Sequence, residues 1–186
     1  MNTNSKQLKE NIRTTYLAKR NMLSKDTIRI SSQAIIKKIM YSDRYLHAKK
    51  IFCYYPNQNE CNLLELAEHA LNADKIVAFP KSSSKRHMDF FQVNALDNFT
   101  LGRFGIMEPS TSCLVHPDED TLILVPGIAF DDKNYRIGHG GGYYDTYFHR
   151  FSHSPYKKLG VYYQWQQTPS IPVESHDIPL DAIIVD

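Results

Sequence analysis

A glycine-rich loop is the part of this sequence best suited to chemistry. Four glycines stand within five consecutive positions, at Gly138, Gly140, Gly141 and Gly142, and the chain has eight glycines in all. Glycine adopts backbone conformations that other residues avoid, and it lets a ligand approach the backbone N–H groups closely. Consecutive N–H groups in such a loop form a concave anion site that commonly takes phosphate. The loop therefore predicts a phosphate site, with a purely structural glycine-rich hairpin as the alternative.

Charged residues flank the glycine-rich loop on both sides. Arg136 precedes it, and Asp145 follows it within residues 143–151, which are predicted to form a helix. The N-terminus of a helix favours negative charge, the arginine supplies a partner for an anion, and the aspartate is a candidate metal ligand. The P-loop pattern is excluded because no Lys-Ser or Lys-Thr follows the glycines. The dinucleotide pattern is excluded because Tyr143 stands where its third glycine should be.

A second cationic feature lies near the N-terminus. Residues 5–22 are predicted to form a helix with an apolar stripe of Leu8, Ile12 and Tyr16 and, beside it, a basic stripe of Lys6, Lys9, Arg13 and Arg20. Like charges four residues apart, such as Lys9 and Arg13, disfavour an isolated helix by a few tenths of a kcal/mol. A bound anion would reverse that effect, whereas a solvated basic face is the alternative interpretation.

The rest of the chain must position these groups. Apolar patterns and turn residues predict strands at 51–55, 76–79, 88–93, 122–125, 159–163 and 182–185, and helices at 27–40, 63–71 and 143–151. The second strand is expected to end at Pro80, with loops at 57–62, 81–87 and 101–109. This alternation predicts one domain over residues 1–186, an α/β three-layer sandwich with a mostly parallel, Rossmann-like central sheet. Ligand-binding loops are expected at the carboxyl ends of the strands.

Composition narrows the function classes. The 186 residues are 42% hydrophobic and 23% charged, which is ordinary for a globular domain, and the net charge of +2 is too small to argue for a nucleic-acid partner. No apolar run approaches the ~20 residues that a membrane span needs. The polar N-terminus does not resemble a signal peptide. Three cysteines without a CxxC pair are typical of free thiols, so a cytoplasmic monomer without a membrane partner is expected.

Several motifs together resemble one known family. VPGIAFD followed by YRIGHGGGYYD (Tyr135 to Asp145) closely resembles the signature of the 5-formyltetrahydrofolate cyclo-ligases, also called methenyltetrahydrofolate synthetases. Lys9 to Arg13 is similar to the family's N-terminal Lys-x-x-Leu-Arg, with isoleucine for leucine. Gly105 to Pro109 resembles its Gly-Ile-x-Glu-Pro loop, and Pro172 to Asp177 resembles its Pro-Val-x-x-x-Asp. The matches occur in the right order over nearly the whole chain.

The resemblance implies a ligase that forms a carbon–nitrogen bond. Its substrate would be a reduced folate, 5-formyltetrahydrofolate, which is closed to 5,10-methenyltetrahydrofolate with ATP as co-substrate and Mg²⁺ as cofactor. The fold implied is the sandwich shared by sugar-phosphate isomerases and coenzyme A transferases. ATP would phosphorylate the formyl oxygen, N10 would attack the activated carbon, and phosphate would leave. Such a reaction needs positioning and charge neutralisation rather than a protein nucleophile.

The resemblance also assigns roles to residues of this sequence. The implied ATP-binding positions are Lys9, Arg13, Arg136, Ile137, Gly138, His139, Gly140, Gly141, Gly142, Tyr143 and Tyr144. The implied folate-binding positions are Tyr55, Glu60, Met107, His139, Gly140, Gly141, Gly142 and Tyr143. Asp145 and Asp177 match the metal positions, and Arg136, Tyr144 and Asp145 are the implied catalytic residues.

One position departs from the family pattern, and two alternatives stay open. His139 stands where tyrosine or arginine is common, and a nearby phosphate would favour its protonated form. A non-catalytic folate- or nucleotide-binding protein would be expected to lack one of the charged site residues, and all of them are present. A sugar-phosphate isomerase on a similar fold would need a general base but no ATP, so the pair of Lys9 and Arg13 argues against it.

Overall fold

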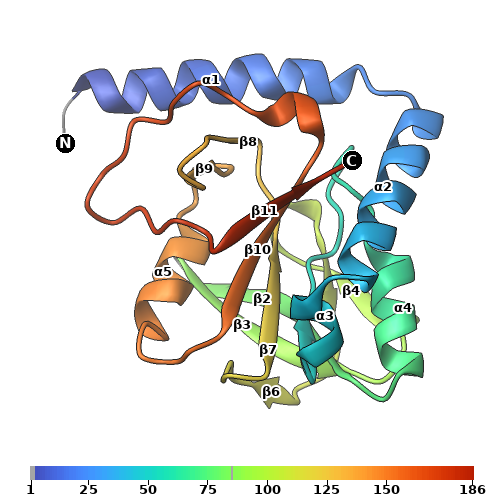
Figure 1. Ribbon diagram of the computed structural model, residues 1–186. Coiled ribbons are helices and arrows are strands. Elements are labelled where there is room, and N and C mark those ends of the chain that lie inside the picture. Colours follow the sequence, from blue (N-terminus) through green and yellow to red (C-terminus); the bar gives the residue numbers. More distant parts are fainter. Residues whose placement is uncertain (1–2, 85) are drawn as a thin grey trace.

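A seven-stranded sheet flanked by helices organises the protein. The computed structural model describes residues 3–84 and 86–186 (Figure 1). The helices are α1 (Thr3–Asn21), α2 (Lys25–Met40), α3 (Asp43–His47), α4 (Leu64–Asn72) and α5 (Tyr143–Arg150), with 3₁₀ turns η1 (Arg103–Gly105) and η2 (Gln164–Gln166). The strands are β1 (Lys50–Phe52), β2 (Ile76–Ser84), β3 (His87–Val93), β4 (Phe99–Leu101), β5 (Met107–Pro109), β6 (Leu114–Val115), β7 (Thr121–Val125), β8 (Ala129–Phe130), β9 (Arg136–Ile137), β10 (Lys157–Tyr162) and β11 (Ala182–Val185).

The strand order contains a point at which the chain reverses direction across the sheet. The order is β11-β10-β7-β1-β2-β3-β6, and β11, β10, β7, β1 and β2 are mutually parallel, whereas β3 is antiparallel to β2 and β6. The chain runs outward from β1 through β2 to the β3–β6 edge and then returns to β7 on the other side of β1. In such sheets ligands bind outside the carboxyl ends of the strands at this switch point. The predicted α/β fold with a mostly parallel sheet is confirmed, and β1 and β7 locate the expected site.

Alternation along the central strands separates two apolar layers. Ile51 and Cys53 face a core formed with α2, α3 and α4, whereas Phe52 between them faces a core formed with α5. In β7, Leu122 and Leu124 join the first core, and Ile123 and Val125 join the second. A sheet buried on both faces explains why the apolar run of β7 is continuous rather than alternating. Figure 1 shows the helices on either side of the sheet, as a three-layer sandwich requires.

Helix α1 covers the end of the sheet rather than one of its faces. Figure 1 shows it lying across the end that carries β8 and β9, the two strands of a short hairpin. Ile12, Tyr16 and Leu17 pack against the small apolar cluster of that hairpin. The predicted apolar stripe was wrong at Leu8, which is 45% exposed because the contact with the cluster begins one turn later. No helix in residues 3–84 and 86–186 is long and apolar enough to cross a membrane.

Two local predictions were wrong and one helix was missed. Strand β2 does not end at Pro80 but continues to Ser84, so most of the predicted 81–87 loop is a β2–β3 hairpin. Strand β1 ends opposite Ala78, so beyond this residue β2 pairs with β3 only. Pro80 is therefore at an edge of the sheet, where its missing N–H group is tolerated. The predicted 101–109 loop contains strands β4 and β5, and helix α3 was not predicted. By contrast, Ser24 caps α2 as expected, accepting a hydrogen bond from Thr27 N.

The packing around Gly160 gives a stability prediction. Gly160 lies in the middle of β10, and a Cβ at this position would come within 2.6 Å of Ile183 Cδ1 and 2.7 Å of Leu180 Cδ1. Adding a methyl group to a packed core typically costs about 1–3 kcal/mol of unfolding free energy. We expect Gly160→Ala to lower the denaturation midpoint accordingly, without a change in the ligand requirements of the folded protein. Gly138→Ala is the matched control for space, because nothing lies within 4 Å of its Cβ position. Equal midpoints in the two variants would contradict this account of the packing.

Candidate active site

A cavity of about 1030 Å³ opens at the carboxyl ends of β1 and β7. Its walls come from α1, the segment after β1, the β2–β3 hairpin, the β4–β5 hairpin, the glycine loop with the start of α5, and residues 174–177. All the predicted ATP, folate and metal positions line this cavity except Met107. Their positions in the sequence run from Lys9 to Asp177, so the switch-point topology brings both ends of the chain to one site.

The glycine loop forms one wall of the cavity through backbone conformations that favour glycine. Gly140 has φ +89° and Gly142 has φ +68°, the left-handed region that side chains with a Cβ rarely adopt. Gly142 is also the N-cap of α5, and no side chain caps this helix end. The first N–H groups of α5 are therefore available to an anion. Strands β8 and β9 form the hairpin that leads into the loop.

The cations of α1 approach the glycine loop and the C-terminal segment. Arg13 Nε donates to Gly138 O at 2.9 Å, and the Arg13 guanidinium also pairs with Glu10. Lys9 Nζ lies 2.6 Å from Asp177 Oδ2 and 3.2 Å from Glu174 Oε2. The predicted basic stripe is therefore only partly at the site. Lys6, Lys9 and Arg13 line the cavity, whereas the side chain of Arg20 is buried in the interior.

Arg136 and Asp145 form a partly buried pair behind the glycine loop. Arg136 Nη2 lies 3.0 Å from Asp145 Oδ1, and its side chain is 5% exposed. Arg136 Nη1 donates to Ile178 O at 2.9 Å, and the guanidinium lies over the ring of Phe148. Asp145 Oδ1 also accepts a hydrogen bond from Ile178 N at 3.2 Å. These contacts bring the segment of Asp177 against the first turn of α5, which places the two predicted metal positions at the same end of the cavity.

A buried carboxylate also lines the cavity. Glu60 is 6% exposed, and its Oε2 accepts a hydrogen bond from Asn57 N at 3.0 Å. Its Oε1 lies 3.3 Å from His139 Nε2 and 3.4 Å from Arg20 Nη1. His139, which departs from the family pattern, is therefore directed toward a carboxylate in this structure. Glu60 keeps accessible surface toward the cavity, where N–H groups of a ligand can reach it.

Aromatic side chains form the remaining walls. Tyr55 packs against Phe99 with ring centroids 5.2 Å apart, and Phe104 of the β4–β5 turn meets Tyr143 of the glycine loop edge-to-face at 5.8 Å. Burial raises the pKa of the Tyr144 phenol far above its ordinary value, so this group keeps its proton at neutral pH. Among the described residues, the Tyr144 hydroxyl has no hydrogen-bond partner. The cavity thus combines apolar faces with a protonated phenol that has no partner within the protein.

The structure adds residues that the sequence did not single out and excludes one that it did. Met107 does not line the cavity; its neighbours Ile106 and Glu108 do, as expected for side chains that alternate along the chain at β5. Arg86 was placed in a loop, but the β2–β3 hairpin carries it to the glycine loop, where its Cδ lies 3.8 Å from the Cβ position of Gly142. The basic character of residues 81–87 could have indicated a cation at the site. It was not used, because these residues were interpreted as a loop and not as the β2–β3 hairpin.

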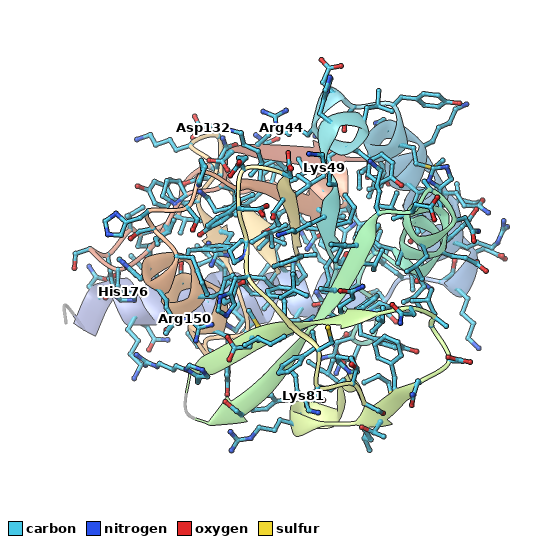
Figure 2. All side chains as sticks on the ribbon, turned by 90° about the horizontal axis from the view of Figure 1, so that it is seen from below. Arg44, Lys49, Lys81, Asp132, Arg150 and His176 are labelled. Carbon is cyan, nitrogen blue, oxygen red and sulfur yellow. The ribbon has the colours of Figure 1, made fainter. Side chains whose placement is uncertain are left out.

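The contacts of α5 hold this wall of the cavity in place. Arg150, at the end of α5, donates to Met88 O and pairs with Asp89, which ties the helix to β3. His149 Nε2 lies 3.3 Å from His176 O, which ties the same helix to the C-terminal segment. Figure 2 shows Arg150 and His176 on the same side of the molecule. Helix α5 therefore links the β2–β3 hairpin, the glycine loop and the segment of Asp177.

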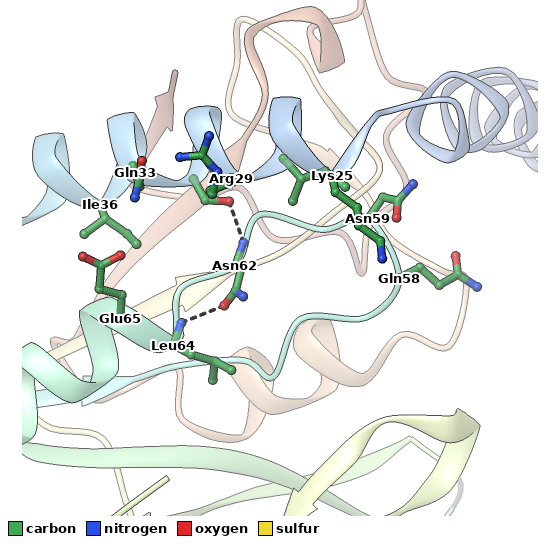
Figure 3. A pocket seen from close by; sticks show the side chains of 11 residues that line it. Lys25, Arg29, Gln33, Ile36, Gln58, Asn59, Asn62, Leu64 and Glu65 are labelled. Carbon is green, nitrogen blue, oxygen red and sulfur yellow. Dashed lines mark hydrogen bonds between the residues drawn. The ribbon is translucent and has the colours of Figure 1, made fainter.

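A second, smaller cavity of about 400 Å³ lies beyond the loop that carries Glu60 (Figure 3). It is lined by α2, residues 58–62 and the start of α4. Asn62 N donates to Ser32 Oγ at 2.9 Å, and Leu64 N donates to Asn62 Oδ1 at 3.0 Å, as drawn in Figure 3. The loop is therefore fixed on this side by α2 and α4, while Asn57 and Glu60 face the larger cavity.

The fold and the site together define a class of protein. A mostly parallel α/β sheet with a glycine-rich loop, convergent cations and carboxylates at its switch point is typical of enzymes that act on phosphorylated or nucleotide ligands. The model of the 5-formyltetrahydrofolate cyclo-ligase family matches residues 5–186, and the chain belongs to this family.

Comparisons with individual proteins agree with the family assignment. The 5-formyltetrahydrofolate cyclo-ligase of Haemophilus influenzae is 27% identical over 189 residues, which cover 100% of both chains. The solved structure of the 5,10-methenyltetrahydrofolate synthetase of Aquifex aeolicus has a TM-score of 0.83 at 34% identity and covers 96% of this chain and 89% of that chain. The corresponding structure from Mycoplasma pneumoniae has a TM-score of 0.77 at 25% identity, over 95% of this chain and 97% of that one.

Proposed function

We propose that this protein is a cyclo-ligase that converts 5-formyltetrahydrofolate into 5,10-methenyltetrahydrofolate, with ATP and Mg²⁺, and releases ADP and phosphate. Membership of the family, over residues 5–186, supports the reaction class. The single structural observation that carries the proposal is the convergence of a glycine loop, the cations of α1, and Glu60 on one cavity. An apolar wall, a carboxylate and an anion site in one space suit a folate and a nucleotide bound side by side.

The chemistry requires a poor leaving group to be activated. The formyl oxygen attacks the γ-phosphorus of ATP, the bond from that phosphorus to the ADP oxygen breaks, and ADP departs. N10 of the folate then attacks the activated carbon, the carbon–oxygen bond breaks with departure of inorganic phosphate, and N10 loses its proton. The formyl oxygen therefore ends in phosphate. Reactions of this kind depend mainly on positioning and on stabilisation of phosphate charge.

Residues of the cavity suit these steps. The N–H groups of the glycine loop and of the first turn of α5, with Arg13 and Lys9, would hold the phosphates. Arg136 is held against Asp145 and would add positive charge behind the loop. Glu60 would accept hydrogen bonds from N–H groups of the pterin, and Tyr55 would offer it an aromatic face. The Tyr144 hydroxyl would donate a hydrogen bond to a ligand oxygen. It would stay protonated, because burial raises the pKa of the phenol.

The residues present also fit a magnesium ion that is shared with the nucleotide. Asp145 and Asp177 would supply oxygen ligands, and Ile178 N, next to Asp177, donates to Asp145 Oδ1. Among the described residues no group of three or more His, Cys, Asp or Glu side chains could hold a metal ion. Mg²⁺ is commonly held by one or two carboxylates with waters and substrate phosphates, so two aspartates suffice. When bound, the ion would neutralise phosphate charge during the transfer.

Other parts of the proposal concern partners and location. We propose a monomer that works in the cytoplasm on a reduced folate and that does not bind nucleic acid, as its small net charge of +2 favours. A non-catalytic binding protein and a sugar-phosphate isomerase are the competing functions. The binding protein is disfavoured because all the predicted charged site residues line the cavity, and the isomerase is disfavoured because Lys9 and Arg13 line it as well.

An isotope experiment tests the proposed mechanism. 5-Formyltetrahydrofolate labelled with ¹⁸O in the formyl group is incubated with the protein, ATP and Mg²⁺, and the released phosphate is analysed by mass spectrometry. We expect one ¹⁸O atom in each phosphate that accompanies methenyltetrahydrofolate, because the formyl oxygen is the atom transferred. Product that forms while the phosphate remains unlabelled and the label passes to water would contradict phosphorylation of the formyl oxygen.

The cations of α1 give a prediction about nucleotide affinity. Lys9→Ala and Arg13→Ala each remove a charge-assisted contact of about 1.5–3 kcal/mol, so we expect the KM for ATP to rise about tenfold or more. The KM for the folate should change much less, because Glu60 and Tyr55 lie on other elements. Lys19→Ala is the matched control, since Lys19 lies on the same helix but packs over Tyr16 outside the cavity. Unchanged ATP dependence in both variants would contradict this role and would favour the alternative interpretation, a solvated basic face of α1.

A further inference from the structure

Arg20 is the least exposed charged side chain among the described residues, at 1% of its accessible surface. It stands near the end of α1, whose earlier cations Lys9 and Arg13 line the cavity. Arg20 does not line the cavity itself. It lies behind Glu60, the carboxylate that faces the cavity, so it can act on a ligand only through another residue.

The contacts of Arg20 are few for a buried guanidinium. Its Nη1 lies 3.4 Å from Glu60 Oε1 and 3.4 Å from Gly127 O, whereas Nε and Nη2 have no hydrogen-bond partner among the described residues. Its backbone carbonyl accepts a hydrogen bond from Asn59 Nδ2 at 3.0 Å, which ties α1 to the loop that carries Glu60. A buried ion pair with incomplete hydrogen bonding is a poor source of stability. Its presence beside a binding cavity therefore calls for a functional explanation.

Among the described residues, Arg20 is the one permanent cation within ion-pair distance of Glu60. His139 lies 3.3 Å from Glu60 Oε1, but its side chain is 47% exposed and it carries charge only when protonated. Several titratable neighbours are neutral at physiological pH, because burial raises the pKa of the Cys61 thiol to about 12 and raises the pKa values of the phenols of Tyr54, Tyr144, Tyr162 and Tyr163. The charged groups of Arg136 and Asp186 act on these side chains from farther away. An enclosed, neutral environment disfavours an ionised carboxylate, and a permanent cation beside it favours one.

We propose that Arg20 is a positioning residue for folate recognition, which fixes the carboxylate of Glu60 in one orientation toward the cavity. Glu60 Oε2 is held by Asn57 N and Oε1 by Arg20, so the carboxylate has one orientation toward the ligand. An ionised acceptor in that orientation selects a heterocycle that presents adjacent N–H donors, as a reduced pterin does. This inference rests on the proposed function, because it assigns Glu60 to the folate.

The test compares Arg20→Met with Lys19→Met, which removes a positive charge one residue away on the exposed side of the same helix. Binding of 5-formyltetrahydrofolate is measured by calorimetry, and kcat and KM are measured separately for the folate and for ATP. For Arg20→Met we expect folate affinity to fall about tenfold or more with the KM for ATP within about twofold. Lys19→Met should match the wild type in each measurement.

A double-mutant cycle with Glu60→Gln distinguishes positioning from general support of the fold. If Arg20 acts through Glu60, Arg20→Met should change folate affinity less than about twofold in the Glu60→Gln background. Multiplicative effects of the two substitutions, or equal losses of ATP and folate affinity, would overturn the inference. Should Arg20→Met fail to fold, Arg20→Lys replaces it, and we expect this variant to lose folate affinity in the wild-type background but less than about twofold in the Glu60→Gln background, because a lysine lacks the planar guanidinium that orients the carboxylate. An equal loss of folate affinity in the two backgrounds would overturn the inference.

The same experiment separates this inference from the proposed function. If the wild type and Lys19→Met form no methenyltetrahydrofolate with ATP and Mg²⁺ and bind no 5-formyltetrahydrofolate, the proposed function fails. If both bind and convert the folate while Arg20→Met behaves as they do, the function stands and only the role of Arg20 is overturned.

Discussion

Replacement of Asp145 by asparagine is expected to reduce turnover by a factor of about 10² or more while the fold persists. Asp145 lies in the first turn of α5 and accepts hydrogen bonds from Arg136 and Ile178 N through Oδ1, which an asparagine oxygen can still accept. What the variant loses is the negative charge that we propose for binding the magnesium ion. Loss of one preorganised electrostatic group in an active site commonly costs about 10²–10³ in kcat. We also expect a high concentration of Mg²⁺ to restore part of the rate, because the weakened ligand set lowers metal affinity.

The measurement for Asp145 is the rate against Mg²⁺ concentration at saturating ATP, with a melting curve for each protein. Asp132→Asn is the matched control, since Asp132 carries the same group in the turn between β8 and β9 but is exposed and does not line the cavity; Figure 2 shows it far from His176. If Asp145→Asn shows normal magnesium dependence, the role of Asp145 is to stabilise the helix N-terminus, where an aspartate contributes about 0.3–1 kcal/mol. If the variant unfolds, the role of Asp145 is the structural ion pair with Arg136. Either outcome would contradict the metal-binding role.

Replacement of Glu60 by glutamine is expected to raise the KM for the folate about tenfold or more and to leave the KM for ATP nearly unchanged. The substitution keeps the size of the side chain but removes the charge, so a charge-assisted hydrogen bond of about 1.5–3 kcal/mol to the pterin becomes a weaker neutral one. It also leaves Arg20 buried without its carboxylate partner, and we therefore expect a lower melting temperature. Steady-state kinetics below the melting transition separates the two effects.

The control for Glu60 is Glu65→Gln, an exposed acid near the start of α4 that lines the smaller cavity instead. It should leave both KM values unchanged. An effect of Glu60→Gln confined to the KM for ATP would contradict the assignment of Glu60 to the folate and would place the nucleotide at this end of the cavity.

Much of the fold could be predicted because its signals are local. The central strands carry apolar runs bounded by glycine and proline, and the helices carry apolar stripes, so β7, β10, α2, α4 and α5 were found within a few residues of their bounds. Pro80 shows where local reasoning failed. A proline normally ends a strand, but whether the strand has one partner or two depends on β1, which ends opposite Ala78. That information lies in the tertiary arrangement and not near Pro80.

The candidate site likewise contains residues that local sequence could predict and residues that it could not. The glycine loop, Arg136 and Asp145 are adjacent in sequence and could be recognised as a unit. Arg20 shared the spacing of Lys9 and Arg13, yet the structure turns it away from the cavity, because the end of α1 crosses above Glu60 and Gly127. The approach of Arg86 to Gly142 depends on the β2–β3 hairpin. Contacts that depend on how distant segments cross could not be read from residue spacing.

The most direct test of the account is the formation of 5,10-methenyltetrahydrofolate from 5-formyltetrahydrofolate, followed by absorbance with and without ATP in the presence of Mg²⁺. Because the formyl oxygen must be converted into a leaving group, we predict that product forms only with ATP and that each product molecule is accompanied by one ADP and one phosphate. Product formation at an unchanged rate in the absence of nucleotide would contradict the account, as would ATP hydrolysis without ring closure.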